Sequence, residues 1–225
     1  MKAENDFSQR SPLRQFELVV EKRSIFVNAH YLAEISPYFE YLCFGDFREA
    51  REGRAELEDE SYDEVIELLR FICPDPEYLL RRDVTEANFA VLTHFSHLMQ
   101  IPSLHRQLEA FIEGEFSSDD YEVKDTSLVD MIVEAKDAAF SDPVMEILHK
   151  KLAKVELERV KELVKKLPGS YAEPILAEVQ RLVQSLISEC QRMWVDDISS
   201  FQHRISGIYP ITSLFRPTIP AVFAL

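Results

Sequence analysis

The order of apolar and polar residues near the start of the chain predicts a β-hairpin. Residues 16–20 (FELVV) and 25–27 (IFV) are rich in apolar and β-branched side chains, which favour strands. The polar residues 21–24 lie between them and predict a reversal of the chain. Because no glycine marks this reversal, the pattern leaves the type of turn open.

The spacing of apolar residues changes after residue 28 to the three-and-four spacing of a helix. Ser36-Pro37 divides this run into two short helices, because serine caps a helix and proline is tolerated at its first position. Gly45-Asp46 ends the second helix, and residues 47–53 are predicted to be a charged loop. Residues 54–58 then alternate small or apolar with charged residues, as a half-buried strand does.

Helical spacing dominates the rest of the chain. Residues 62–73, 85–99 and 102–113 predict three helices, of which the last two are joined by a short link and pack antiparallel. A polar linker at residues 115–126 marks the expected domain boundary, and four further helical patterns follow it. We therefore predict an α+β fold, with a small sheet flanked by helices over residues 15–114 and an all-helical C-terminal extension over residues 127–195.

The two ends of the chain lack a regular period. Residues 1–14 are polar and include Pro12, so we expect a flexible N-terminal arm. Residues 207–225 combine many apolar residues with three prolines. This tail is expected either to dock in an extended form on the body or on a partner, or to be disordered.

The composition restricts the kinds of partner. The 225 residues carry a formal charge of −15, with 40 acidic and 25 basic residues, and no basic run is dense enough to attract a phosphate backbone. We therefore expect no binding of nucleic acid. No stretch has the length needed to span a bilayer, and the first residues lack the apolar run of a signal peptide, so we expect no membrane partner either.

The three cysteines, Cys43, Cys73 and Cys190, favour neither a disulfide framework nor a zinc site. Their number is odd, their spacing is wide and no Cys-x-x-Cys pair occurs. This usage is typical of a reducing compartment, so we expect a cytoplasmic or nuclear protein. Cys43 and Cys73 lie among apolar neighbours and are interpreted as small core residues.

Motifs for catalysis are not found in the sequence. It has no glycine-rich phosphate loop, and His94 and His97, three apart on a predicted helix, lack further ligands at metal-site spacing. We expect no catalytic residue, no cofactor and no metal, and we interpret the two histidines as helix-surface residues. A metal-dependent enzyme at these histidines is the alternative from another class, which metal analysis of the purified protein would test.

A resemblance to a known family rests on residues 27–39 (VNAHYLAEISPYF), which are similar to the V-H-K-x-x-L-A-x-x-S-x-Y-F pattern of BTB/POZ domains. The matching residues are Leu32, Ala33, Ser36, Tyr38 and Phe39. Residues 44–49 (FGDFRE) resemble the F-x-G-D-F-x-E stretch of the BTB branch that often accompanies MATH domains. The resemblance covers residues 15–114, and the later helices look like the BACK-like helical extension that follows many BTB domains.

The resemblance implies a protein–protein interaction adaptor. Many BTB domains bind a cullin scaffold protein through a hydrophobic-x-Glu motif after the second helix, and so act as the substrate-recruiting subunit of a cullin-RING ubiquitin ligase. Phe47, Arg48 and Glu49 stand at that position and are the candidate cullin contacts. The implied partners are a cullin and an unknown ubiquitination target. The alternative is a BTB dimerisation or assembly scaffold, for example in transcriptional or cytoskeletal complexes, with no ligase role.

The sequence leaves two features open. The Phe47 ring is expected either to be exposed for a partner or to fold back under its own loop, and the two arrangements are compatible. Gln15 stands where many family dimers carry an aspartate, so the resemblance allows a homodimer without requiring one. Asn28 replaces a common histidine, although its side chain can still make a local hydrogen bond.

Overall fold

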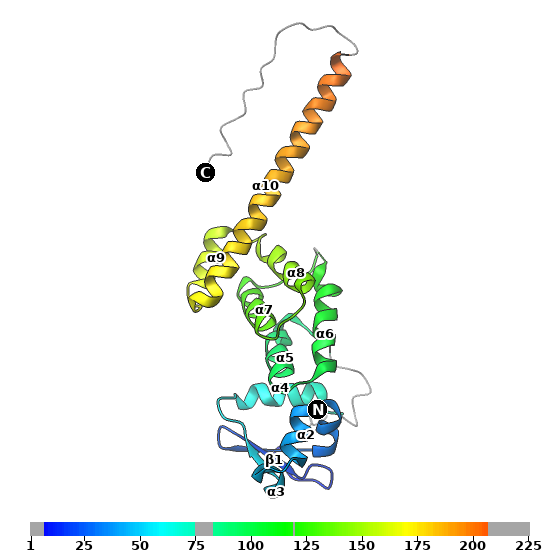
Figure 1. Cartoon of the computed structure of the whole chain (residues 1–225), viewed down its shortest axis with the longest axis vertical. Helices are drawn as coiled ribbons and strands as arrows, with labels where there is room; N and C mark the ends of the chain where they lie inside the picture. The colour runs from blue at the N-terminus through cyan, green and yellow to red at the C-terminus, as the bar shows by residue number, and fades with distance from the viewer. Residues whose placement is uncertain (1–6, 75–82, 119, 207–225) are drawn as a thin grey trace, which may run out of the picture. The chain divides into compact units, whose positions relative to one another are not determined.

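The chain contains a three-stranded sheet followed by helices, which confirms the predicted α+β class (Figure 1). The computed structural model describes residues 7–74, 83–118 and 120–206, with side chains as far as residue 193. The chain divides into two compact units, Met1–Val179 and Gln180–Leu225.

The sheet of the first unit has the order β2-β1-β3, with β1 (Phe16–Val20) in the middle. β1 pairs antiparallel with β2 (Arg23–Val27) and parallel with β3 (Arg54–Glu56). The predicted hairpin is therefore confirmed. Its turn residues Glu21 and Lys22 both have positive φ, 50° and 64°, as in the type I′ turn that matches the right-handed twist of paired strands.

A helical crossover joins β2 to β3, the strand on the other edge of the sheet. It consists of α1 (Ala29–Ile35), α2 (Pro37–Phe44) and α3 (Arg48–Glu52). Because β2 and β3 lie on opposite edges of the sheet, with β1 between them, a tight turn cannot join them and the chain needs a longer connection. Within it, α3 packs against both α2 and the edge strand β3.

Side-chain caps begin the first two helices of the crossover. The Asn28 side chain accepts a hydrogen bond from the Tyr31 amide at 3.2 Å, and the Ser36 hydroxyl accepts one from the Phe39 amide at 3.1 Å. The predicted division at Ser36 is therefore confirmed. Asn28 makes the local hydrogen bond that was expected of it.

The expectation of a charged loop at residues 47–53 is wrong, because most of this segment forms α3. The Arg51 amide donates to the Phe47 carbonyl at 3.4 Å, and Nε of Arg48 lies 3.9 Å from Oε1 of Glu52 one turn later. The glycine that follows ends the helix with φ 63°. Charged pairs at helical spacing accompany this short element, so a search for apolar periods does not detect it.

Helices α4 (Tyr62–Ile72), α5 (Glu86–Leu98) and α6 (Pro102–Glu113) follow the sheet. α5 packs against both α4 and α6. Most of the apolar residues predicted to point inward are buried, which confirms these helices: Val65, Leu69, Phe89, Leu92, Phe95, Met99, Leu104, Leu108 and Ile112. Residues 75–82, in the predicted loop before α5, lie outside the described residues.

The expectation of a flexible arm over residues 1–14 is wrong for residues 7–14. Phe7 is only 2% exposed, and its carbonyl accepts a 2.7 Å hydrogen bond from the Phe26 amide of β2. The Arg14 guanidinium lies over the Phe7 ring, 4.5 Å from its centroid. One buried ring therefore anchors a polar segment that has no period of its own. The residues before Phe7 lie outside the described part of the chain.

The predicted helical extension is present as α7 (Asp125–Asp137), α8 (Asp142–Leu152), α9 (Leu157–Val164) and α10 (Gly169–Ser206). α10 continues past residue 195, the predicted end of the extension. The tail predicted at residues 207–225 lies outside the described residues. Within the part of the chain that the structure describes, no helix is long and apolar enough to cross a bilayer.

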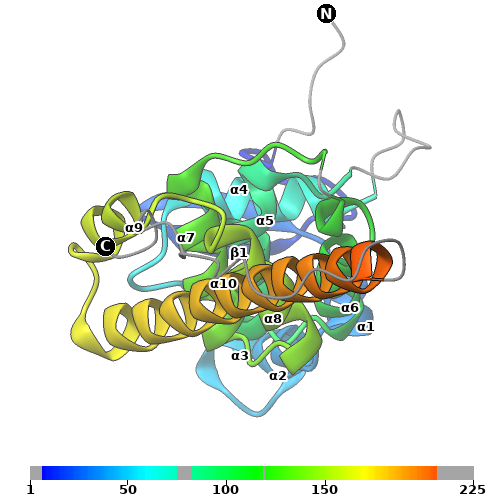
Figure 2. The ribbon, with the colours of Figure 1, turned by 90° about the horizontal axis from the view of Figure 1, so that it is seen from above.

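The polar linker at residues 115–126 marks no break between compact units. Phe116, in the single turn η1 (Glu115–Ser117), is buried and packs against Phe111, and the Tyr121 ring meets Phe111 edge-on. α7 packs against α5, and α8 packs against both α6 and α7 (Figure 2). The helices as far as Val179 therefore share one compact unit with the sheet.

Candidate functional site

The candidate residues Phe47, Arg48 and Glu49 lie where α2 ends and α3 begins. Gly45 is the C-terminal cap residue of α2, and Phe47 is the N-terminal cap residue of α3. Because α3 starts at Arg48, directly after Phe47, the three side chains leave the backbone within one turn of each other. The structure therefore brings all three candidates together, and none of them is buried.

The Phe47 ring is packed on one side and exposed on the other. A Cβ added to Gly45 would lie 2.9 Å from Cδ2 of the Phe47 ring and 2.5 Å from the Tyr41 carbonyl oxygen, so the ring lies over a glycine with no room for a side chain. Phe47 is nevertheless 55% exposed. The ring therefore lies against the end of α2 while much of its surface stays open to solvent.

The Glu49 carboxylate is partly open to solvent and has a cation beside it. Its side chain is 36% exposed, and a terminal nitrogen of the Arg48 guanidinium lies 3.9 Å from Oε1. Arg48 makes a second contact of the same length with Glu52. Exposed ion pairs contribute at most about 1 kcal/mol, so a donor from a partner can replace Arg48 at Glu49 at little cost.

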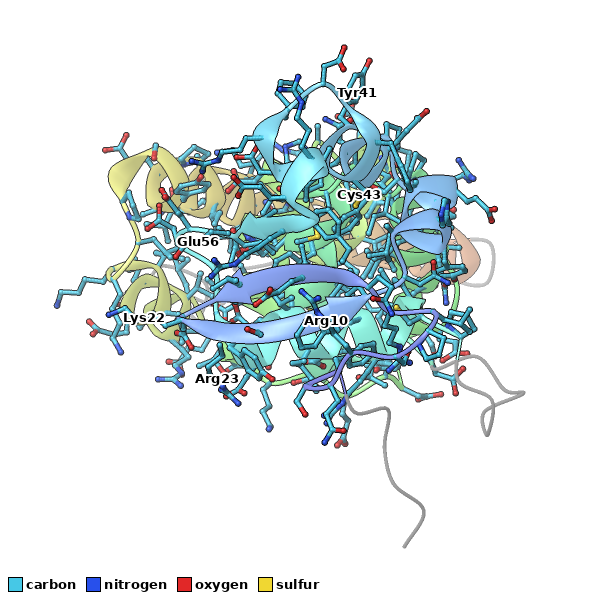
Figure 3. The ribbon with its side chains drawn as sticks, turned by 90° about the horizontal axis from the view of Figure 1, so that it is seen from below. Arg10, Lys22, Arg23, Tyr41, Cys43 and Glu56 are labelled. Atoms are coloured by element: carbon cyan, nitrogen blue, oxygen red, sulfur yellow. The ribbon has the colours of Figure 1, made fainter. Side chains whose placement is uncertain are left out.

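Two further aromatic residues extend this surface along α2. Tyr41 and Phe44 are 68% and 51% exposed, and Tyr41 points away from the body in Figure 3. The His30 ring of α1 packs against Phe44 with 4.9 Å between centroids, which orients the exposed ring. We call Tyr41, Phe44 and Phe47 the aromatic face. Large apolar side chains grouped on a surface mark an interaction site.

Acidic side chains outnumber basic ones around the aromatic face. Residues 40–52 contain four carboxylates and two guanidinium groups, none of them buried: Glu40, Asp46, Glu49 and Glu52 with Arg48 and Arg51. The chain as a whole carries a formal charge of −15. This surface is therefore complementary to a partner that presents apolar side chains flanked by basic ones.

The opposite side of α2 belongs to the core. Burial raises the pKa of the Cys43 thiol to about 12. Burial also raises the pKa of the Cys73 thiol to about 12, against a smaller lowering by the charge of Arg14. Both groups are neutral thiols near neutral pH. Cys43 is buried and Cys73 half-buried, which agrees with their interpretation as small core residues.

We expect these two thiols to resist alkylation until the fold opens. In a Cys190→Ser variant, which removes the exposed cysteine, a maleimide reagent at about pH 8 should label no thiol of the native protein and both remaining thiols in urea. The thiolate is the reacting form, and a pKa of about 12 keeps its population small in the folded protein. Rapid labelling of the folded variant would contradict this expectation.

The same thiols ionise at lower pH in the unfolded chain than in the folded one. The free energy of unfolding should therefore fall as the pH rises toward the folded pKa of about 12.

His94 lies between two carboxylates. Its Nε2 is 3.3 Å from Oε2 of Glu60, and its Nδ1 is 3.5 Å from Oε2 of Glu134. Burial raises the pKa of Glu134, and the adjacent His94 opposes this shift. Among the described residues, no group of three or more His, Cys, Asp or Glu is arranged to hold a metal ion. The contacts of His94 therefore join α5 to α7 and to the turn before α4.

The first half of the chain is similar to known proteins. Residues 5–115 match the family model described as BTB/POZ domain. The chain is 34% identical over 116 residues to Cytokinesis defective protein 7 of Caenorhabditis elegans, and 33% identical over 97 residues to BTB and MATH domain-containing protein 38 of the same organism. The aligned segments cover 51% and 43% of this chain but 41% and 24% of those proteins. The chain therefore matches less than half the length of each of these curated relatives.

Proposed function

Because this chain belongs to the BTB/POZ family through residues 5–115, we propose that it is the substrate-recruiting subunit of a cullin-RING ubiquitin ligase. BTB domains are protein–protein interaction modules, and this chain is accordingly an interaction adaptor. The observation that supports the ligase role is the exposed aromatic face beside Glu49. Aromatic side chains are enriched among the few residues that contribute most of the binding energy of a protein interface.

In this proposal the Phe47 ring enters an apolar pocket of the cullin, and Glu49 accepts a charge-assisted hydrogen bond from it. The ring is already held against Gly45, so its ordering on binding costs little conformational entropy. The acidic surroundings of the aromatic face would increase the rate of association with a basic cullin surface.

We assign the adaptor to the cytoplasm or the nucleus. All three cysteines are free, as is usual in a reducing compartment. The thiols of Cys43 and Cys73 have a pKa raised by burial and are therefore neutral near neutral pH. The ubiquitination target is a second protein bound at the same time as the cullin.

A Phe47→Ala, Glu49→Ala double variant should weaken binding to a purified cullin N-terminal domain by about 100-fold or more, because an anchoring ring and its neighbouring acceptor are both lost. Calorimetry with the full chain measures the affinity, and far-UV circular dichroism checks the fold. Both side chains are at least partly exposed, so the double variant should unfold at nearly the same urea concentration as the wild type.

Leu13→Ala is the matched control, because Leu13 is another exposed large apolar residue on a different segment. It should leave cullin affinity unchanged. If the wild type and the double variant bind the cullin equally well, Phe47 and Glu49 are not the contacts. If the wild type does not bind any cullin, the ligase role is wrong and the dimerisation or assembly scaffold without a ligase is the better description.

A further inference from the structure

In the second unit, α10 carries a row of apolar side chains that the described residues leave uncovered. Leu186, Ile187 and Met193 are 51%, 43% and 70% exposed, and Cys190 is exposed as well. Val179, earlier in the same helix, is fully buried within the first unit. One helix therefore passes from a covered to an uncovered apolar face within a few turns, and an uncovered face of this size marks an interaction surface.

Nine apolar residues of this helix form three series with a spacing of eleven positions. The three series are Leu176, Ile187 and Ile198; Val179, Cys190 and Phe201; and Val183, Trp194 and Ile205. Charged residues share the period, with Glu178 and Glu189 in one series and Arg181 and Arg192 in another. Eleven residues over three turns, about 3.67 per turn, keep the repeated positions on one face of a long helix and are the signature of a supercoiled pair.

The length of the repeat suits a pair of helices. Residues 183–205 all lie within α10, which ends at Ser206. At about 1.5 Å per residue they form a stripe of roughly 34 Å. A helix partner with the same eleven-residue period would remain in contact along the whole stripe.

The charge of the segment favours a second copy of this chain as that partner. Residues 180–206 contain three arginines and three carboxylates, so their formal charge is zero with histidine neutral, in a chain of charge −15. Two copies repel each other over most of their acidic surface but not over this segment. This segment has no net charge to attract a strongly charged partner. An identical helix, in contrast, carries apolar residues with the same eleven-residue period and can match them along its length.

We propose that residues 183–205 of α10 pair with the same segment of a second copy of this chain. Pairing between identical surfaces is the commonest form of assembly in soluble proteins, because each copy supplies the complement of the other. The pairing is independent of the proposed cullin contact, which uses residues of the first unit. It supplies a dimer contact that does not depend on the aspartate that Gln15 replaces.

Ile187→Glu in the full chain tests the pairing, with Ser188→Glu as the matched control. Both variants add one carboxylate to neighbouring exposed positions with the same helix propensity, but residue 188 lies outside the repeat. Trp194 is the only tryptophan of the chain and falls within the repeat, so its fluorescence reports on this segment alone. Light scattering gives the molar mass of the same samples.

At micromolar concentration the wild type should have the mass of a dimer, and its tryptophan emission should shift to the red on dilution. Ser188→Glu should behave in the same way. Ile187→Glu should raise the dissociation constant at least about tenfold, because a carboxylate would enter an apolar contact. Cys190→Glu, at a second exposed position of the repeat, should give the same result.

Two outcomes would overturn the pairing. One is a wild-type monomer whose tryptophan emission does not depend on concentration. The other is a dimer whose mass and emission are the same in Ile187→Glu as in the wild type, which would mean that the copies meet through another surface. Neither outcome alters the cullin measurement, so failure of the pairing and failure of the ligase role are distinguishable.

Discussion

Replacing Phe140 with alanine is expected to lower the free energy of unfolding of the first unit by about 3–5 kcal/mol. Phe140 is buried between α7 and α8, and its ring meets Phe89 of α5 and His105 of α6 edge-on, with 6.0 Å and 4.5 Å between centroids. Phe140 belongs to the extension, but the cavity that its ring would leave lies against α5 and α6 of the BTB domain. Both parts should therefore lose stability together, as one transition at lower urea concentration in far-UV circular dichroism.

Ala139→Gly, in the same turn, is the control for this experiment. Ala139 has a φ of 54°, a conformation that costs energy for a residue with a Cβ, so glycine should leave stability unchanged or raise it by up to about 1 kcal/mol. The two variants thus separate the loss of the buried ring from a disturbance of the turn. Two transitions in Phe140→Ala, with the later one at the wild-type position, would show that the extension unfolds independently of the BTB domain.

The parts of the fold that the sequence predicts are those whose residues repeat with a regular period. One face of α5 is buried, and its residues Phe89, Leu92 and Phe95 therefore recur at helical spacing. Caps at Asn28 and Ser36 are local as well, since each side chain bonds to an amide three residues later. Local patterns of this kind are visible without knowledge of the tertiary structure.

Other parts depend on contacts that leave no period in the sequence. Residues 7–14 are ordered by the burial of a single ring, Phe7, against a strand that follows much later. α3 has charged residues where a search for helices expects apolar ones. The linker at residues 115–126 is polar overall, yet Phe116 and Tyr121 pack it onto α6. In each case the contacts that decide the structure do not depend on a regular apolar spacing.

The candidate site also has residues that the sequence predicts and residues that only the structure reveals. Phe47, Arg48 and Glu49 were identified by resemblance to a family motif, and the structure places them together at the surface. Tyr41 and Phe44 were missed, although their aromatic character is plain in the sequence. α2 has apolar residues on both faces, and only the packing of the whole domain decides which face is covered. A helix that is apolar all round signals either full burial or a binding surface.

Ser36→Ala is expected to lower the free energy of unfolding by about 2–3 kcal/mol, because it removes a helix cap and a buried hydrogen bond at once. Ser36 is 1% exposed. Its hydroxyl accepts from the Phe39 amide in α2 and donates to the Met99 carbonyl at the end of α5. Alanine leaves both backbone groups without this partner in the core. Urea denaturation followed by circular dichroism measures the loss.

Ser96→Ala is the matched control, because Ser96 is also buried but donates only to the Thr93 carbonyl of its own helix. We expect it to cost about 1 kcal/mol or less, since a hydroxyl bonded within its own helical turn stabilises that helix little. Both variants remove one oxygen from a buried serine, so the difference between them isolates the connection between α2 and α5. Equal losses would mean that this connection contributes no more than a bond within one helix, and that apolar packing alone holds α2, and with it the aromatic face, on the domain.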